Sequence, residues 1–380
     1  MVVLKYLQSR FYRKTPSLPF PLLIIESDDW GFVRVPSKQI RDEIERNNPS
    51  LLTNPYLRYD GLENIADIEE LVNLLSGVRD CDNNPCVITA NFIMGNPDYL
   101  KIEQSGFTGF FDEGFIVSYK NAHGSDEVFQ KQKYACSERV FVPQYHGMHH
   151  VNVNRWMKSL VQADPLTRSA FGRQMVSYHS SAVKAGDPCV DFFLDAMNPA
   201  NREELNEITR LNKEGLAQFE NTWGYKSQTM IAPCYIWHKE MEPEMRGIGI
   251  GAFQGQRLQK ECRLANNPND FRRVYHYQGE QHKGGIYYFL RDSFFEPSLD
   301  PKIDWVNLAF GQVDSSLKRQ GFSILCSHRL NFIGSLEVKN RENCLRGLLL
   351  LLKKIREKWP DIRFASTNQL YQYYSAKGDA

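Results

Sequence analysis

Residues 22–31 read LLIIESDDWG, a short apolar run followed directly by acidic residues. The branched apolar side chains predict a buried β-strand over residues 22–26. A doubly wound nucleotide-binding sheet would place a glycine-rich phosphate loop after its first strand. Here that place is taken by Ser27, Asp28 and Asp29, and the two carboxylates would repel a phosphate. The stretch therefore favours a β/α barrel, in which functional side chains follow the strands.

Further β-rich runs follow along the chain, and segments with helical spacing separate them. The predicted strands cover 22–26, 86–92, 140–144, 229–233, 248–253, 322–326 and 362–365, and the predicted helices cover 36–47, 64–76, 152–162, 167–183, 201–221, 302–319 and 339–358. This alternation predicts a mostly parallel sheet with helices outside it. Seven strands fit an α/β fold of the distorted single-domain (β/α)7 barrel type over 21–380, with 1–20 as an N-terminal extension. An open doubly wound sheet is the competing architecture.

The composition excludes several classes of protein. The chain has 380 residues, 42% of them hydrophobic, and 46 Lys and Arg against 45 Asp and Glu give a net charge of +1. A nucleic-acid partner is therefore not expected, since such proteins carry a basic surplus. The sequence has no run of about 18 apolar residues, so we predict no transmembrane segment. The oligomeric state is left open by the sequence.

The cysteines and the N-terminus bear on the compartment. The eight cysteines form no CxxC pair, so we expect free thiols and a reducing environment. The first residues have no secretory signal pattern, which favours a cytoplasmic location. Residues 4–14 contain basic and apolar positions that could touch the inner membrane or a partner, although a solvated, frayed terminus is the preferred explanation.

The block QYHGMHH, residues 144–150, contains candidate metal ligands. His146 and His150 are four residues apart, so a helical turn would place both imidazoles on one face. Two neutral imidazoles and one carboxylate form a facial triad with open positions for water and substrate. We expect His149 to point elsewhere on such a turn.

Two more blocks follow predicted strands. In SHRLNF, residues 327–332, His328 is placed for acid or base chemistry near neutral pH, although a packed or capping histidine is the alternative. In IAPCYIW, residues 231–237, Tyr235 and Trp237 could form an aromatic platform for a sugar, and aromatic core packing is equally consistent with them.

In their order along the chain, these four blocks resemble the polysaccharide deacetylase superfamily, also called carbohydrate esterase family four, from about residue 24 to 332. The resemblance implies a distorted seven-stranded barrel with a divalent metal, expected to be Zn²⁺, and an acetylated amino sugar or polysaccharide as substrate. It implies that Asp29, His146 and His150 are metal ligands. It further implies that Asp28 is the general base and that His328 protonates the leaving amine.

The resemblance also implies residues that contact the substrate. We expect Trp30, Tyr235, Trp237 and Arg329 in this role, with a backbone N–H near Tyr235 holding the oxyanion.

The chain departs from the family pattern at several positions. Trp30 stands before the glycine of the acidic block, and Ile231 stands where the family has the arginine that orients the base. Arg291 or Arg329 could replace that arginine. The carboxylate partner of the late histidine is not evident, and the candidates, each also explained as a structural residue, are Asp292, Glu296 and Asp304.

Two other functions remain compatible with the sequence. One is a catalytically inactive barrel that binds metal or carbohydrate, which the missing arginine suggests. The other is a glycoside hydrolase with two carboxylates, which would need an acid such as Glu26 or Glu296 facing Asp28 across roughly 5 to 10 Å.

Overall fold

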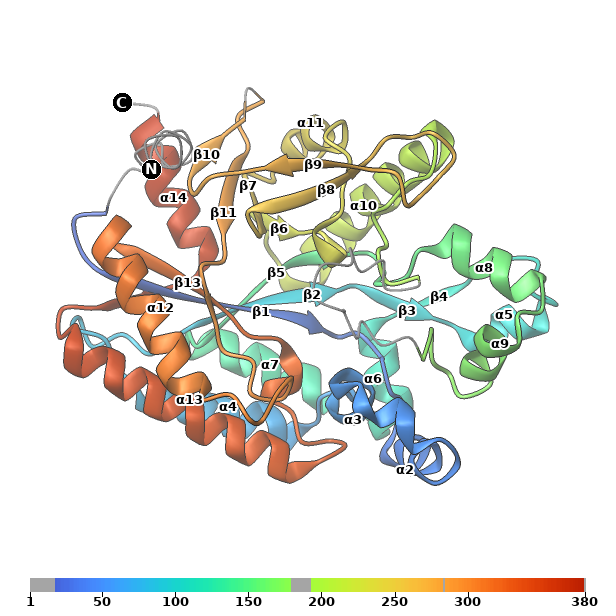
Figure 1. Cartoon of the computed structure of the whole chain (residues 1–380), viewed down its shortest axis with the longest axis horizontal. Helices are drawn as coiled ribbons and strands as arrows, with labels where there is room; N and C mark the ends of the chain where they lie inside the picture. Colours follow the sequence, from blue (N-terminus) through green and yellow to red (C-terminus); the bar gives the residue numbers. More distant parts are fainter. Residues whose placement is uncertain (1–17, 179–192, 283, 379–380) are drawn as a thin grey trace, which may run out of the picture.

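The computed structural model describes residues 18–178, 193–282 and 284–378. A single curled sheet forms the centre of the molecule (Figure 1). Its ten strands are β1 (Leu22–Trp30), β2 (Ile88–Ile93), β5 (Phe141–Gly147), β6 (Thr229–Ile231), β7 (Ala252–Gly255), β10 (Glu280–Gln281), β11 (Tyr287–Leu290), β12 (Ser293–Phe294), β13 (Phe322–Cys326) and β14 (Arg363–Ala365). Two small antiparallel pairs lie outside it: β3 (Gly95–Pro97) with β4 (Asp112–Gly114), and β8 (Leu258–Cys262) with β9 (Phe271–Tyr275).

The strand order in the sheet is β10-β11-β7-β6-β5-β2-β1-β13-β12, and β14 also pairs with β1. The pairings are parallel except for β10 with β11. The predicted parallel α/β sheet is therefore confirmed, and each of the seven predicted strands has a counterpart in it. The predicted number of seven is too low for this sheet, because β10, β11 and β12 are only two to four residues long and give little periodic signal.

Helices surround the curled sheet and share one hydrophobic core with its strands. The α-helices are α2 (Lys38–Asn47), α3 (Pro55–Tyr59), α4 (Ile65–Gly77), α5 (Tyr99–Gln104), α6 (Phe115–His123), α7 (Glu127–Ser137), α8 (Val153–Val161), α9 (Pro165–Phe171), α10 (Arg202–Trp223), α11 (Met241–Gly247), α12 (Trp305–Gln320), α13 (Val338–Lys358) and α14 (Thr367–Gly378). Three short 3₁₀ helices are η1 (Pro49–Thr53), η2 (Pro233–Tyr235) and η3 (Arg329–Asn331). In Figure 1, α4, α7, α12 and α13 lie below the sheet, and α10 and α11 lie above it.

Helix α13 illustrates how the sequence produces this layer. Leu345, Leu348, Leu352 and Ile355 recur at helical spacing and are buried in the main hydrophobic core. The helix predicted over 339–358 is thus confirmed. The helix predicted over 167–183 is shorter than expected, since α9 ends at Phe171, and positions 179–183 lie outside the described residues.

The predicted extension over 1–20 begins outside the described residues, but its last part packs on the domain. Leu18 is buried, and its backbone N–H donates to the carbonyl oxygen of Gln320. Phe20 makes an edge contact with Tyr373 at 5.6 Å between ring centroids. The described cysteines carry free thiols. Among the described helices, none combines the length and the apolar character that a membrane crossing requires.

Candidate metal centre

A bulge at the end of β1 turns two consecutive aspartates toward one cavity. The pairing of β1 with β2 shifts register between Ser27 and Trp30, and Asp29 has a left-handed backbone with φ of 73°. In a regular strand, Asp28 and Asp29 would point to opposite faces, whereas here both line a cavity of about 440 Å³. Backbone strain of this kind is typical of functional sites.

The last residue of the block, Gly31, has a steric reason to be glycine. Its φ is +79°, and a Cβ atom there would lie 2.9 Å from the carbonyl oxygen of Ile93. The bulge and this close approach together explain the sequence DDWG: two aspartates face the cavity, the tryptophan turns into the core, and the glycine allows neighbouring backbone to pack closely.

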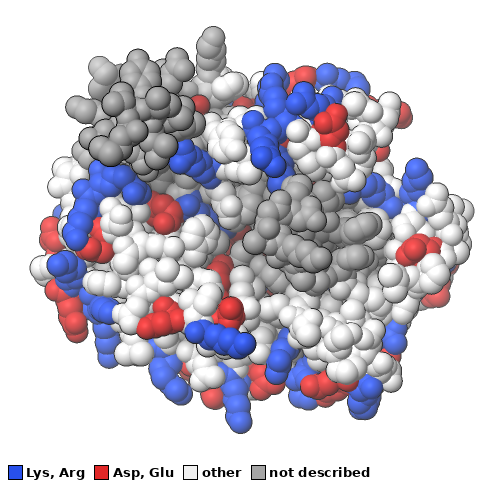
Figure 2. All heavy atoms as spheres, viewed as in Figure 1, with Lys and Arg blue, Asp and Glu red and all other residues white. Residues whose placement is uncertain are grey.

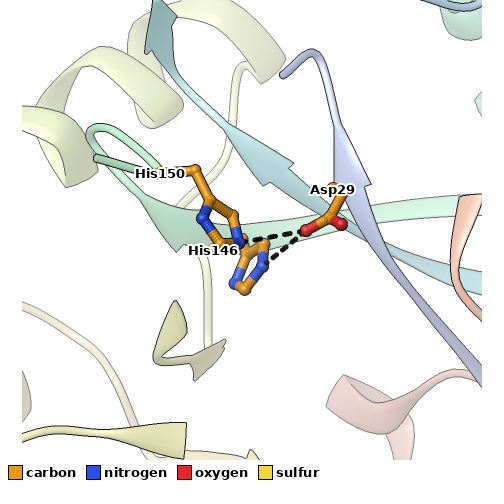
Figure 3. A group of neighbouring side chains, drawn as sticks. All are labelled: Asp29, His146 and His150. Carbon is orange, nitrogen blue, oxygen red and sulfur yellow. Dashed lines mark hydrogen bonds and ion pairs between the residues drawn. The ribbon is translucent and has the colours of Figure 1, made fainter. Parts of the chain in front are cut away.

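The histidine block forms a different local structure from the one predicted. Residues 146–150 are not helical: strand β5 continues to Gly147, where φ is 130°, and the chain then turns. The predicted helical turn is therefore wrong, but His146 and His150 still converge. Figure 3 shows both rings directed at Asp29, whose Oδ1 lies 3.3 Å from His146 Nε2 and 3.2 Å from His150 Nε2.

These three residues suit a divalent cation. The carbonyl oxygen of Ile231 accepts a hydrogen bond from His146 Nδ1 at 3.0 Å, so that nitrogen carries the proton and Nε2 presents its lone pair to Asp29. One ligand atom from each of the three residues lies within 4.8 Å of the others, and all three side chains are buried. Two imidazoles and one carboxylate are the donor set of a facial triad. His149 points away and contacts Asp112 at 2.9 Å, as expected.

Arg34 supports the triad from the other side of Asp29. Its Nη2 lies 3.3 Å from Asp29 Oδ2, and its Nε donates to Asp60 Oδ2 at 2.8 Å. The guanidinium also lies over the ring of Tyr56, 4.7 Å from the centroid. Although burial opposes it, the charges and hydrogen bonds of the two histidines and the charge of Arg34 lower the pKa of Asp29. Arg34 thus leaves Oδ1 as the oxygen that faces the imidazoles.

Asp28 is held by a fully buried arginine. Arg291 donates from Nη1 to Asp28 Oδ2 at 2.6 Å and from Nη2 to Oδ1 at 2.7 Å, and its Nε donates to Glu26 at 2.7 Å. Burial would raise the pKa of Asp28, but the charge and hydrogen bonds of Arg291 hold it well below its usual range. Of the two arginines considered as replacements for the family's arginine, Arg291 therefore has the required geometry. It follows β11, one of the strands that the sequence did not predict.

His328 follows β13, the strand next to β1, and is paired with Glu296. The distance from His328 Nδ1 to Glu296 Oε1 is 2.7 Å, and the backbone N–H of His328 also donates to that carboxylate. Nε2 of His328 lies 3.9 Å from Asp28 Oδ2. Burial lowers the pKa of His328, but Glu296, and to a lesser extent Asp28 and Asp29, raise it to about 9. Among the three candidate partners, Glu296 is the one in contact.

Three residues predicted to contact substrate are instead structural. Trp30 has no exposed surface, and its Nε1 donates to Ser27 Oγ at 2.9 Å. Trp237 is 2% exposed and stacks on Phe253. Arg329 is fully buried between Asp60 and Glu63, with N–O distances of 2.7 and 2.8 Å. Like residues that contact a substrate, these three lie at or after the ends of strands, but their side chains are buried inside the protein. The prediction that they contact substrate is therefore wrong for all three.

Tyr235 does line the cavity, and its hydroxyl accepts a hydrogen bond from Arg291 at 3.1 Å. Its backbone N–H is engaged with the carbonyl oxygen of Ala232, so that N–H is not directed at an oxyanion. The sequence analysis missed other residues of the wall, namely Arg34, Tyr56, Gln256, Leu258, Lys260, Phe294 and Leu299. They lie on loops, short strands and the five-residue helix α3, where no sequence pattern marks them.

Comparisons with known proteins give distant likenesses. No family model matches the chain, and no curated protein matches it. A 4-alpha-glucanotransferase from Thermococcus litoralis is similar in structure with a TM-score of 0.44 and 8% identity; the match covers 94% of this chain and 40% of that one. A candidate polysaccharide deacetylase from Mycobacterium smegmatis has a TM-score of 0.39 and 11% identity, with 96% of both chains covered. A GH57-type branching enzyme from Pyrococcus horikoshii has a TM-score of 0.44 and 11% identity, with 93% of this chain and 70% of that chain covered. Likenesses this distant indicate no activity for this chain.

Proposed function

We propose that this chain is a metal-dependent hydrolase that removes an acetyl group from the nitrogen of an amino sugar, free or within a polysaccharide. One observation carries the proposal: Asp29, His146 and His150 converge as a ligand set on the same cavity that Asp28 and His328 line. A cation held by those three residues, with Zn²⁺ as the first candidate, supplies Lewis-acid polarisation of the acetyl carbonyl and acidifies water. The side chains around the triad supply the proton transfers.

Asp28 is the proposed general base. Arg291 keeps its carboxylate ionised, so Asp28 is unprotonated, as a general base must be, across the pH range of most enzymes. The same bidentate contact fixes the orientation of the carboxylate, because a planar guanidinium holds both of its oxygens. The inactive alternative was suggested by the missing motif arginine, and Arg291 provides a guanidinium at the carboxylate that this arginine would contact.

His328 is the proposed general acid. Its pKa of about 9 keeps the imidazole protonated at neutral pH, as protonation of a leaving amine requires. Glu296 binds Nδ1, so Nε2 is the nitrogen that presents its proton to the cavity. The proposed acid and base follow the paired strands β1 and β13 and line the same cavity, so both can reach one bound acetamido group.

The contacts give less support to a glycoside hydrolase. That reaction requires a protonated carboxylic acid that reaches the glycosidic oxygen. Glu26 has a raised pKa through burial, but it is fully buried, is bonded to Arg291 and Thr367, and does not line the cavity. Glu296 lines the cavity but accepts hydrogen bonds from His328 and Asn331.

Metal analysis combined with acetate release tests the proposal. Purified protein should bind about one equivalent of Zn²⁺, and the loaded protein should release acetate from N-acetylated amino sugars and their oligomers. His146→Ala should lose both the metal and the activity. Absence of metal binding, or full activity in His146→Ala, would refute the proposal.

A further inference from the structure

A buried ionic network begins at Asp29 Oδ2, the carboxylate oxygen that Arg34 contacts. Arg34 joins this aspartate to Asp60, and Arg329 continues the network from Asp60. Nε and Nη2 of Arg329 donate to Asp60 Oδ1 at 3.2 and 2.7 Å, and its Nη1 donates to Glu63 Oε2 at 2.8 Å. A continuous run of ion pairs therefore leads from a candidate metal ligand to the connection between α3 and α4.

Glu63 also contacts the bulge at the end of β1. Its Oε1 accepts a hydrogen bond at 3.2 Å from the backbone N–H of Gly31, two residues after Asp29. The same oxygen accepts hydrogen bonds from Tyr119 of α6 and Gln132 of α7, so this carboxylate is anchored to two helices. The network thus contacts the candidate ligand in two ways, through its side chain and through the backbone that follows it.

The burial of this network argues against a purely stabilising role. The side chains of Arg329 and Glu63 have no exposed surface, and that of Asp60 is 1% exposed. By contrast, Figure 2 shows acidic and basic side chains spread over the visible face of the molecule, where water solvates them. Desolvation of buried ion pairs commonly costs as much as their attraction returns, so apolar side chains of similar volume would stabilise the fold equally well. Buried ion pairs do fix geometry, because their hydrogen bonds require particular distances and directions.

The backbone that the network contacts is one that needs support. Asp29 has a φ of 73° and Gly31 a φ of 79°, so both residues of the bulge are left-handed. A non-glycine residue keeps this conformation only where its surroundings hold it. Asp29 must also keep Oδ1 close to the ring nitrogens of His146 and His150 if the three are to share a cation. A small rotation of the backbone at the bulge would move that oxygen away from the imidazoles.

We propose that Arg329 and Glu63 are positioning residues of the candidate metal centre. Through the ion pairs and the backbone hydrogen bond described above, they hold Asp29 so that Oδ1 faces the two imidazoles. The proposal rests on the proposed function, because the cation is what gives this orientation its use. Arg329, which the sequence analysis expected to contact substrate, thus acts on the centre from within the protein interior.

The test measures the affinity of the full-length protein for Zn²⁺ by calorimetry. Arg329→Lys keeps the positive charge, but a single ammonium does not reproduce the planar donors that bind both Asp60 and Glu63. Glu63→Gln is nearly isosteric, but its amide lacks the charge that pairs with Arg329 and has one acceptor oxygen in place of two. Each variant should raise the Kd for Zn²⁺ by about tenfold, as changes around metal ligands typically do.

A second buried ion pair provides matched controls. Arg341 of α13 donates to Asp67 of α4 at 2.8 Å, and Asp67 also accepts the backbone N–H of Gly334. The side chains of this pair are 11% and 1% exposed. Arg341→Lys and Asp67→Asn therefore remove the same kinds of contact from a pair that joins two helices. Both controls should keep the wild-type Kd for Zn²⁺, even if denaturant titrations show that they are less stable.

Cobalt provides a readout that a loss of stability alone would not change. The visible absorption of bound Co²⁺ depends on the geometry of its ligands, so Arg329→Lys and Glu63→Gln should alter the spectrum, whereas Arg341→Lys and Asp67→Asn should not. Wild-type affinity and spectrum in both Arg329→Lys and Glu63→Gln overturn the proposal. Equal losses in the two controls also overturn it.

If the wild type binds no metal, the proposed function fails, and crystal structures of the metal-free proteins test the positioning alone. In the wild type and both controls, Asp29 Oδ1 should lie within hydrogen-bond distance of His146 Nε2 and His150 Nε2, where the contacts are 3.3 and 3.2 Å. In Arg329→Lys and Glu63→Gln, the carboxylate should be displaced from at least one imidazole. An unmoved carboxylate in both variants overturns the inference.

Discussion

Replacement of Glu296 by glutamine should shift the proton affinity of His328. The pKa of His328 is about 9, against an ordinary value of 6.5, because Glu296 and two aspartates favour the imidazolium. Each pKa unit is worth about 1.36 kcal/mol, so the stabilisation of the imidazolium has an upper limit of about 3 kcal/mol. Glu296 provides only part of it, since Asp28 and Asp29 contribute and the His328 side chain is 22% exposed. We therefore expect Glu296→Gln to lower the pKa of His328 by about one to two units.

The primary assay is the pH dependence of kcat/KM for acetate release. In the wild type, activity should fall as the pH rises through about 9, when His328 loses its proton. In Glu296→Gln, the same fall should occur about one to two pH units lower. Asp304→Asn is the matched control, because Asp304 is an exposed cap of α12 and asparagine also caps helices. An unchanged alkaline limb in Glu296→Gln would show that Glu296 does not set the pKa of His328.

Stability provides a second assay that does not depend on the reaction. A group whose pKa is raised by folding stabilises the native state fully below its unfolded pKa, and this contribution is lost as the pH rises through the folded pKa. For His328, the free energy of unfolding should therefore decline between about pH 6.5 and 9. Glu296→Gln should reduce this decline, as measured by urea denaturation at several pH values. A decline of the same size in both proteins would contradict the pairing.

Four further outcomes are expected. His146→Ala should weaken metal binding more than about 100-fold by calorimetry, whereas His149→Ala, which removes a neighbouring ring that faces Asp112, should bind metal as the wild type does; equal losses would exclude the triad. Arg34→Lys keeps the charge but loses the two-sided contact with Asp29 and Asp60, so metal affinity should fall about tenfold or more, and an unchanged affinity would show that Arg34 does not support the triad. Asp28→Asn should retain metal while kcat falls by at least about 100-fold, and near-normal turnover would exclude Asp28 as the base. Trp30→Ala should lower the free energy of unfolding by about 3 to 5 kcal/mol in denaturant titrations while the folded protein keeps its KM; a raised KM with normal stability would restore Trp30 as a substrate contact.

Much of the sheet could be predicted because its central strands are long and apolar. Strand β1 shows this best, since the run from Leu22 to Ile25 is fully buried and the acidic block follows it directly. Strand β11 escaped prediction because Tyr287–Leu290 is short and its partner β10 is shorter still. As a result, the residue that holds Asp28 remained uncertain until the strand that positions it was known.

The candidate metal ligands His146 and His150 could be predicted because they are close in the sequence and also close in space. His146 and His150 converge although the predicted helical turn is absent, because a turn after Gly147 brings the second ring back. Burial could not be read from residue type alone. Trp30 and Trp237 follow strands as a sugar platform would, yet their rings fill the core. Arg34 is a common surface residue by type, and its contact with Asp29 depends on the loop that follows β1.

The guanidinium that holds Asp28 comes from a strand other than the one expected. The resemblance places an arginine at position 231, at the end of β6, whereas Arg291 reaches the same carboxylate from the end of β11, two strands away in the sheet. The carboxyl ends of parallel strands lie along one rim of the sheet. A guanidinium at the end of one strand can therefore occupy the same position in space as a guanidinium at the end of another. A comparison of sequence motifs would report the arginine as missing, although a guanidinium is present at the carboxylate. Searches for relatives of this chain would do better to compare charges in space around the rim than motifs along the sequence.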